Sequence, residues 1–238
     1  LWYPSIPMTK LAQLSEDLRD HISNPDVVRA IIKELNDEIA YCPILRNIER
    51  ERNHNISEED VIVFSDLGDE DRNEVYVYLG RILESVLTCI LSDSFKVKKD
   101  RTSSGDLTIQ DIIWEIKGTS AENSWTGSTH ATKKEDERMN FIGVKYGMNK
   151  DVNIFDILNG SVTLIDEIFI GIFDDLRLIR KGTAKENSSR TQLYISIQDY
   201  DELKNKVAWG NLSYPDGGIY KKDGTLKKNV KYLKLEAA

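Results

Sequence analysis

The hydrophobic pattern changes its period near residue 105, and this change limits the chain to folds that combine helices with a sheet. Before that point apolar residues recur with helical spacing, most regularly over Val75–Leu91. After Gly105 apolar and polar residues alternate, as they do over Ile112–Lys117, and alternation is the period of a strand. We therefore predict an α/β fold, more narrowly α+β, with a mixed sheet flanked by helices.

The order of elements indicates a helical N-terminal region over residues 1–73, packed on a core over residues 74–238 within one structural domain. Asn24 and Pro25 are a typical helix start, because Asn caps the first turn and Pro fits the first helical position. The polar stretch Asn47–Asp60 is expected to end the N-terminal helices. Further expected elements are strands over Asp106–Ile109, Phe141–Tyr146, Ile168–Phe173 and Gln192–Ile197, helices over Ala131–Met139 and Asp199–Val207, and a polar loop over Thr119–His130.

Composition excludes several classes of protein. The formal net charge of −8 argues against a generic nucleic-acid binder. The acidic excess lies in residues 1–95, however, and residues 96–238 contain several basic clusters. No uninterrupted apolar run approaches the roughly 20 residues of a membrane span, so no membrane association is expected. Two cysteines are too few for a disulfide framework, and no secretory signal is visible, which together favour an intracellular protein.

Three polar residues of types that often take part in catalysis lie in the first predicted hairpin. If Gln110 and Asp111 form its two-residue loop, Asp106 lies directly opposite Glu115, and their side chains point to the same face. Lys117 returns to that face two residues later. The opposite face is then apolar, with Leu107, Ile109, Trp114 and Ile116.

Two carboxylates at this separation repel unless a cation lies between them or one takes up a proton. Their hard oxygen atoms suit Mg²⁺, which also binds a phosphate. The neighbouring Lys117 could hold or deprotonate an attacking water, or offset charge that develops on phosphorus. This is one arrangement for hydrolysing a phosphodiester. The alternative is an exposed strand face on which the three residues make ordinary cross-strand pairs.

The residues around the hairpin favour the first interpretation. Gly105 and Gly118 bracket the three polar residues, which is consistent with close approach of a ligand backbone, although each also suits a turn. The segment that follows, Thr119–His130, is rich in hydroxyl groups and leads to Lys133 and Lys134. Such small donors are useful beside a phosphate backbone.

Gly105-Asp106, followed after eight residues by Glu115-Ile116-Lys117, resembles the active-site motif of the PD-(D/E)XK nuclease superfamily. Gly80 and Glu84 also resemble that superfamily's preceding helix, in which Gly80 would let the helix approach the sheet and Glu84 would face the carboxylates. Gly105 stands where the motif has proline. The resemblance covers about a third of the chain and implies a restriction-endonuclease-like core within residues 74–238, with DNA-contacting elements toward its C-terminal end.

Within the superfamily the chain looks most like a type II restriction endonuclease, a class that acts as homodimers on double-stranded DNA in the prokaryotic cytoplasm. The resemblance implies that Asp106, Glu115 and the main-chain carbonyl of Ile116 bind Mg²⁺. Lys117 would position the water, and Glu84 would hold a second metal ion or an ordered water.

DNA contacts are expected in two segments. Thr126, Ser128, Thr129, Lys133 and Lys134 are candidates for backbone phosphates, with plain surface solubility as the alternative. Ser189 and Arg190 precede an apolar strand and could reach bases, since Arg reads guanine well, while a simple polar turn would explain them otherwise.

The sequence leaves two other functions open. A repair or junction nuclease of the same superfamily would carry the same motif. A non-enzymatic acidic interaction module would carry it by coincidence, and that interpretation predicts neither metal binding at Asp106 and Glu115 nor any effect of replacing Lys117.

Overall fold

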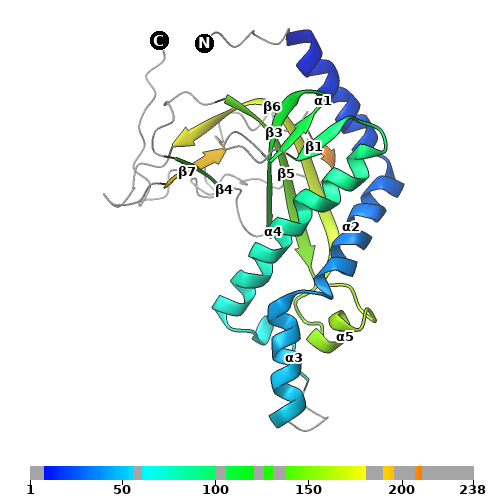
Figure 1. The fold of residues 1–238 in the computed structure, drawn as a ribbon, viewed down its shortest axis with the longest axis vertical. Coiled ribbons are helices and arrows are strands. Elements are labelled where there is room, and N and C mark those ends of the chain that lie inside the picture. Colours follow the sequence, from blue (N-terminus) through cyan, green and yellow to red (C-terminus); the bar gives the residue numbers. More distant parts are fainter. Residues whose placement is uncertain are drawn as a thin grey trace.

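The computed structural model describes residues 8–55, 61–99, 106–120, 126–130, 138–180, 190–195 and 207–210. Within them the chain has a mixed α/β fold in which long helices lie along a twisted sheet (Figure 1). The helices are α1 (Met8–Ile22), α2 (Pro25–Ile39), α3 (Pro43–Asn55), α4 (Asp69–Ser92) and α5 (Ile154–Leu158), with a short 3₁₀ turn, η1, over Phe64–Asp66. The strands are β1 (Val97–Lys99), β2 (Leu107–Ile109), β3 (Ile112–Ser120), β4 (Thr126–His130), β5 (Arg138–Met148), β6 (Ile165–Arg180), β7 (Arg190–Ile195) and β8 (Val207–Trp209).

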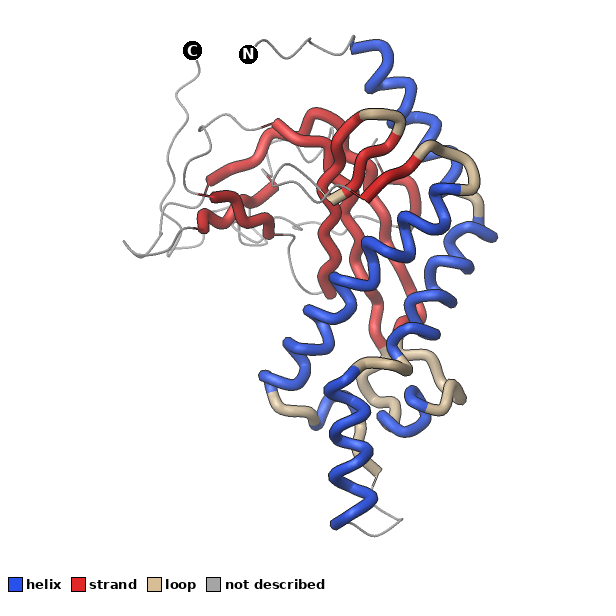
Figure 2. Tube along the Cα trace, viewed as in Figure 1, coloured by secondary structure: helices blue, strands red, loops and turns tan. Residues whose placement is uncertain are grey.

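The sheet is mixed, as the sequence predicts. Its strands follow the order β1-β2-β3-β5-β6-β7-β4, and β8 pairs with β6 beside this path. The β3–β5 pair is parallel, whereas the other pairs are antiparallel. Figure 2 shows α4 crossing the β1–β3 part of the sheet, while α3 and α5 lie beyond one end of the strands.

Side chains of α1 and α2 tie these helices to β6. The Arg19 guanidinium donates to the carbonyl oxygen of Ile172 (3.1 Å). The Asn36 amide donates to the carbonyl of Ile165 and accepts from its main-chain N–H, so it completes hydrogen bonds that the strand end would otherwise lack. One hydrophobic cluster accordingly runs from α1 and α2 through α4 into the strands.

The helix start at Asn24 is confirmed. The Asn24 side chain accepts from the N–H of Asp26, and Pro25 occupies the first helical position of α2. The apolar stripe of α2 is fully inside the protein and consists of Val28, Ile31, Leu35 and Ile39.

The helix predicted over Val75–Leu91 is longer than expected, because α4 begins at Asp69. By length and mean hydropathy (1.4 over 18 residues) α4 is the one described helix that could cross a membrane, but that test is weak evidence, since core helices also pass it. Its buried residues are Val75, Leu79, Ile82, Leu83, Val86, Leu87 and Leu91, which pack against the sheet and α2 as in a core helix.

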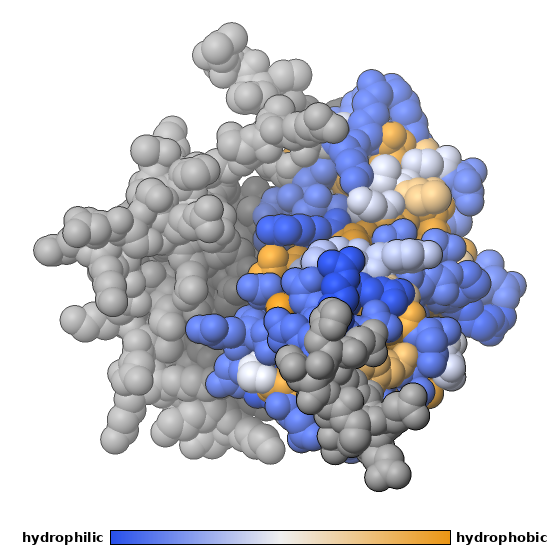
Figure 3. Space-filling view, turned by 60° about the horizontal axis from the view of Figure 1, so that its bottom comes forward, coloured by the Kyte–Doolittle hydropathy of each residue, from blue (hydrophilic) through white to orange (hydrophobic). Residues whose placement is uncertain are grey.

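On the side drawn in Figure 3 most of the described surface is hydrophilic. Its hydrophobic residues form separate small patches. Exposed large apolar side chains of the described residues include Tyr41 and Val77.

Four expectations differ from the structure. Thr126–His130 is a strand, β4, and not part of a loop, because it pairs with β7 far along the chain. The helix expected to extend to Met139 is wrong at its end, since Arg138 and Met139 already belong to β5; its residues 131–137 lie outside the described residues. The helix expected over Asp199–Val207 is also wrong at its end, since Val207 begins β8; residues 199–206 lie outside the described residues. The polar stretch Asn47–Asp60 does not end the helices at its start, because α3 continues as far as Asn55.

The two faces of the sheet differ in what they carry. On β5, Ile142, Val144 and Tyr146 belong to the core cluster shared with the helices. By strand alternation Phe141, Gly143 and Lys145 lie on the opposite face. There Phe141 stacks on Phe173, with ring centroids 6.0 Å apart. Parallel pairing places Glu115 beside Phe141 and Lys117 beside Gly143, so the candidate catalytic side chains share this second face.

Candidate active site

The β2–β3 hairpin has the predicted register over its three pairs, although Asp106, expected within the strand and opposite Glu115, immediately precedes β2. Ile109 pairs with Ile112, Thr108 with Ile113, and Leu107 with Trp114. Gln110 and Asp111 form the two-residue loop, both with positive φ (49° and 67°), which is the geometry of a type I′ turn. The turn is held by the residue that precedes β1, since the Gln110 N–H donates to the Lys96 carbonyl (2.9 Å).

This register brings Asp106, Glu115 and Lys117 together. Lys117 Nζ lies 2.5 Å from Glu115 Oε1 and 3.3 Å from Asp106 Oδ2. The Asp106 carboxylate also accepts from the main-chain N–H of Ile116 (2.8 Å), and the Asp106 N–H donates to the Trp114 carbonyl (2.9 Å). The three side chains are 20–29 % exposed, so a ligand can reach them while most of their surface is removed from water.

The carboxylates hold Lys117 in its charged form. Burial favours the neutral amine, but the negative charges of Glu115 and Asp106 outweigh it and raise the pKa of Lys117 above its ordinary value. The ammonium is therefore a fixed positive charge between the two acids.

Glu84 approaches the same cluster from α4. Burial raises the pKa of Glu84, and the Asp106 carboxylate adds to this increase, while Lys117 and Lys99 oppose it. Three acidic groups thus share one electrostatic environment. Gly80, in contrast, does not bring the helix closer, because a Cβ at that position would meet nothing within 4 Å.

The donor set fits Mg²⁺ by its chemistry. Asp106 and Glu115 supply hard oxygen atoms, and Glu84, whose pKa is raised first by burial and then by Asp106, is a third acid in the same environment. Among the described residues no three His, Cys, Asp or Glu side chains are grouped as ligands of one ion. This is compatible with Mg²⁺, which is commonly held by one or two carboxylates together with waters and substrate phosphate.

The candidate DNA-binding residues fall in another part of the sheet. Thr126, Ser128 and Thr129 lie on β4, which pairs with β7, and His130 of β4 lies opposite Arg190 of β7. The two segments expected to contact DNA are therefore neighbours in one antiparallel ladder. Lys133, Lys134 and Ser189 lie outside the described residues.

Two lysines near the cluster were not predicted from the sequence. Lys99 Nζ donates to Ser85 Oγ (2.6 Å), beside Glu84. Lys145 lies on β5, opposite Thr119 of β3, and is buried. The strand alternation that placed Lys117 could have found Lys145, but only after the parallel partner of β3 was known.

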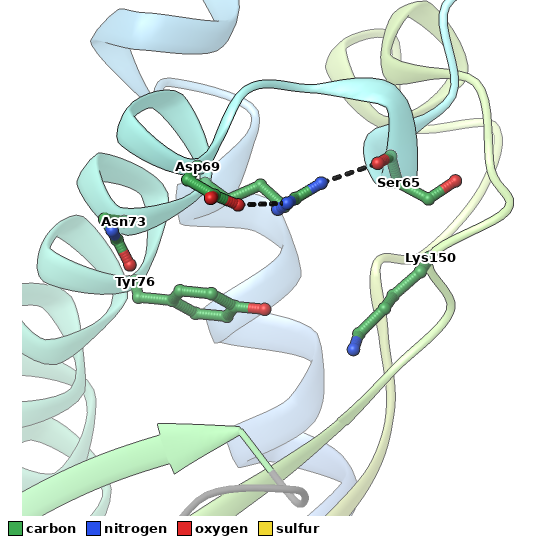
Figure 4. Close-up of a pocket in the computed structure, with 6 residues that line it drawn as sticks. Ser65, Asp69, Asn73, Tyr76 and Lys150 are labelled. Atoms are coloured by element: carbon green, nitrogen blue, oxygen red, sulfur yellow. Dashed lines mark hydrogen bonds and ion pairs between the residues drawn. The ribbon is translucent and has the colours of Figure 1, made fainter.

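A separate pocket of about 400 Å³ lies at the start of α4 (Figure 4). The Arg72 guanidinium is held there by Asp69 (2.5 Å) and the Ser65 carbonyl (2.6 Å), and the Tyr76 and Lys150 side chains extend into the space beside it. No residue of this pocket belongs to the Asp106–Glu115–Lys117 cluster, so the pocket takes no part in the chemistry of that cluster.

Compared with known family models and with curated proteins, the chain has no significant match.

Gly118 tests how closely β3 packs beside the cluster. A Cβ on Gly118 would clash with the hydroxyl and ring of Tyr146, which is buried in the core. We expect Gly118→Ala to lower the free energy of unfolding by about 1–3 kcal/mol, measured by urea denaturation. Gly80→Ala is the matched control, since it meets no neighbour and replaces a helical glycine, and it should raise stability by roughly 0.5–1 kcal/mol. Equal effects of the two changes would contradict this packing.

Glu84 should make the metal-free protein less stable as pH rises. Its folded pKa is raised, so its contribution to stability is complete below the ordinary value of 4.5 and is lost as pH rises through the folded pKa. Glu84→Gln removes this loss. We therefore expect the Tm of the variant, relative to wild type in EDTA, to increase between pH 4.5 and pH 8.

The control is Glu74→Gln, an exposed change on the same helix. A Tm difference for Glu84→Gln that stays constant over this pH range, as for Glu74→Gln, would show that neither burial nor the neighbouring carboxylates raise the pKa of Glu84.

Proposed function

We propose that this chain is a Mg²⁺-dependent endonuclease of the PD-(D/E)XK type that cleaves double-stranded DNA, and more narrowly a type II restriction endonuclease. The observation that carries the proposal is the convergence of Asp106, Glu115 and Lys117 on one face of the β2–β3 hairpin, next to Glu84. Ordinary cross-strand pairs would explain Lys117 with one carboxylate. They do not explain why a second carboxylate contacts the same ammonium, or why the charge of Glu84 interacts with all three residues.

Asp106 and Glu115, with the main-chain carbonyl of Ile116, would hold the metal ion. Bound Mg²⁺ would polarise the phosphodiester and lower the pKa of a water at the site. Glu84 would accept a hydrogen bond from an ordered water or help to bind a second ion.

Lys117 would orient the attacking water or offset the negative charge that develops on the phosphoryl oxygens. In hydrolysis the water oxygen bonds to phosphorus, one P–O ester bond breaks, and the leaving alkoxide takes up a proton. A positive charge fixed beside two acids is arranged for this before the substrate binds, so the reaction needs little reorganisation of the site.

The rest of the proposal follows from the class. Type II enzymes cut both strands of a short site, and a homodimer with one active site for each strand would do this. The class acts in the prokaryotic cytoplasm. The β4–β7 ladder, with Thr126, Ser128 and Thr129 opposite the strand that begins at Arg190, would contribute DNA contacts.

The first test is incubation of the purified protein with unmethylated plasmid and phage DNA in Mg²⁺, in Ca²⁺ and in EDTA. Discrete, reproducible fragments in Mg²⁺ alone would support a site-specific endonuclease and locate the site. Smears or nicks would support a repair or junction nuclease of the same superfamily instead. Intact DNA together with no Ca²⁺-supported DNA binding would contradict the nuclease proposal and support an interaction module.

A further inference from the structure

Lys99 is an exposed lysine beside the helix that carries Glu84. It ends β1, the first strand in the order of the described sheet, and it pairs with Leu107 of β2. Paired residues of neighbouring strands point to the same face, so Lys99 points toward the helices, as Leu107 of the core cluster does. Asp106 directly precedes Leu107. Because strands lie about 4.8 Å apart and rise about 3.3 Å per residue, the Cα atoms of Lys99 and Asp106 are roughly 6 Å apart.

A hydrogen bond determines where the Lys99 ammonium lies. Its Nζ donates to the hydroxyl of Ser85 on α4 (2.6 Å), and Ser85 is exposed as well. Ser85 directly follows Glu84, and the positive charge of Lys99 opposes the increase in the pKa of Glu84 that burial and Asp106 cause. The ammonium therefore lies on the α4 side of the candidate active site, close enough for its charge to act on Glu84.

The Lys99 ammonium and the Ser85 hydroxyl can both donate to a further group. Within the part of the chain that the structure describes, no ion pair includes Lys99, and its hydrogen-bond partner Ser85 is neutral. A lysine ammonium has three N–H donors, of which this bond uses one. The hydroxyl accepts from Lys99 and still has its own hydrogen to donate. The pair thus presents a positive charge and a neutral donor to the solvent.

The fixed ammonium distinguishes Lys99 from a lysine that only protects the edge of a sheet. Edge strands carry lysines to keep other strands from pairing with them, and that role needs a charge but no particular position of the ammonium. Lys99 is instead held against α4 by Ser85. A cation that is already held in place loses less side-chain freedom when it binds an anion, so it binds the anion more tightly.

We propose that Lys99 and Ser85 together bind one DNA backbone phosphate, next to the phosphate that is cleaved. The inference rests on the proposed nuclease function and adds a contact outside its motif. Lysine and serine side chains are typical contacts of the DNA backbone, and the bond from a lysine to a phosphate is charge-assisted. Phosphates of one strand advance about 3.4 Å along the duplex axis per nucleotide, so a cation one strand away from Asp106 is within range of a neighbouring phosphate. Lys99 then helps to place the scissile phosphate at the acids.

The first experiment measures binding in Ca²⁺ of a duplex that carries the cleavage site, over a series of salt concentrations. Lys99→Met keeps the length of the stem and removes the charge. We expect it to weaken binding about three- to tenfold and to reduce the slope of log K against log salt by about 0.9, the value for one lost phosphate contact. Lys99→Arg should keep the slope. Ser85→Ala should weaken binding about threefold and also keep the slope, because the hydroxyl carries no charge.

Lys96→Met is the matched control. Lys96 shortly precedes β1 and is exposed, but it pairs with Asp111 at the turn of the hairpin (3.2 Å). The change therefore removes the same charge from the same region, away from the cluster. We expect the salt slope of Lys96→Met to equal that of the wild type.

A second experiment separates a direct phosphate contact from an indirect effect of the substitution. A set of duplexes is made, each with one neutral methylphosphonate at a phosphate close to the scissile bond. One of these duplexes should weaken wild-type binding as much as Lys99→Met does. On that duplex Lys99→Met should have no further effect, since the contact is already lost.

A wild-type salt slope for Lys99→Met, or additive losses on every methylphosphonate duplex, would overturn the inference. Discrete cleavage by the wild type in Mg²⁺ would in that case leave the nuclease proposal intact. Wild-type affinity of Ser85→Ala would overturn the part assigned to the hydroxyl. Wild-type protein that binds no DNA in Ca²⁺ and cleaves none in Mg²⁺ would overturn both proposals.

Discussion

Replacing Lys117 by methionine is expected to lower the single-turnover rate of Mg²⁺-dependent DNA cleavage by about 10²- to 10³-fold, and Asp106→Asn by at least as much. Removal of one preorganised electrostatic group from an active site has effects of this order. Lys117 contacts both carboxylates, and Asp106 in addition accepts the Ile116 N–H, so both residues are central to the cluster. The rate is measured with enzyme in excess over DNA, so that product release does not limit it.

The control for this prediction is Asp111→Asn. Asp111 lies in the turn of the same hairpin and pairs on the surface with Lys96 (3.2 Å), away from the cluster. It should cleave at nearly the wild-type rate, because exposed ion pairs contribute little. DNA binding in Ca²⁺ should persist in Lys117→Met. Cleavage by Lys117→Met or Asp106→Asn within a fewfold of wild type would remove the basis of the proposed function.

Trp114→Ala is expected to lower the free energy of unfolding by about 3–5 kcal/mol, more than Gly118→Ala does. Trp114 is completely buried, opposite Leu107, on the face of β3 that packs toward the helices. A loss of this size corresponds to a decrease in Tm on the order of 10 °C for a domain of this length. Urea denaturation followed by circular dichroism measures it without relying on tryptophan fluorescence.

Trp114→Phe provides the comparison. The indole Nε1 is buried and has no hydrogen-bond partner among the described residues, so its removal costs no bond, and the ring change should cost less than half of the alanine change. Similar losses for the two variants would show that the indole N–H, and not the packed volume, is what stabilises this position.

The part of the molecule that could be predicted from the sequence is the part determined by local pattern. Alternation over Ile112–Lys117 with a two-residue loop at Gln110-Asp111 was enough to predict the register of the hairpin, and the register places Asp106 beside Lys117. Helix α2 was predictable for the same reason, since its cap and its apolar stripe are both local signals.

What could not be predicted depends on partners far along the chain. Thr126–His130 is polar throughout, so nothing in its own sequence indicates a strand, and β4 exists because β7 supplies the other half of the ladder. Lys145 lies within a predicted strand, but its place on the face of Glu115 and Lys117 follows only from the parallel pairing of β3 with β5. Gly80 shows the opposite error. A glycine in this helix suggests close packing against the sheet, but a Cβ at Gly80 would meet no atom within 4 Å.

The two-residue turn at Gln110-Asp111 also determines which genetic changes this site could survive. Substitutions in the turn alter only its local strain, because the strands on either side keep their pairing. Gain or loss of a single codon there is different, since a shift of one residue turns every side chain of β2 to the other face. Leu107 would then stand where Asp106 stands, and an acid would enter the core. Lineages that keep this chemistry should therefore vary at these two positions among residues that tolerate positive φ, and almost never in the number of turn residues.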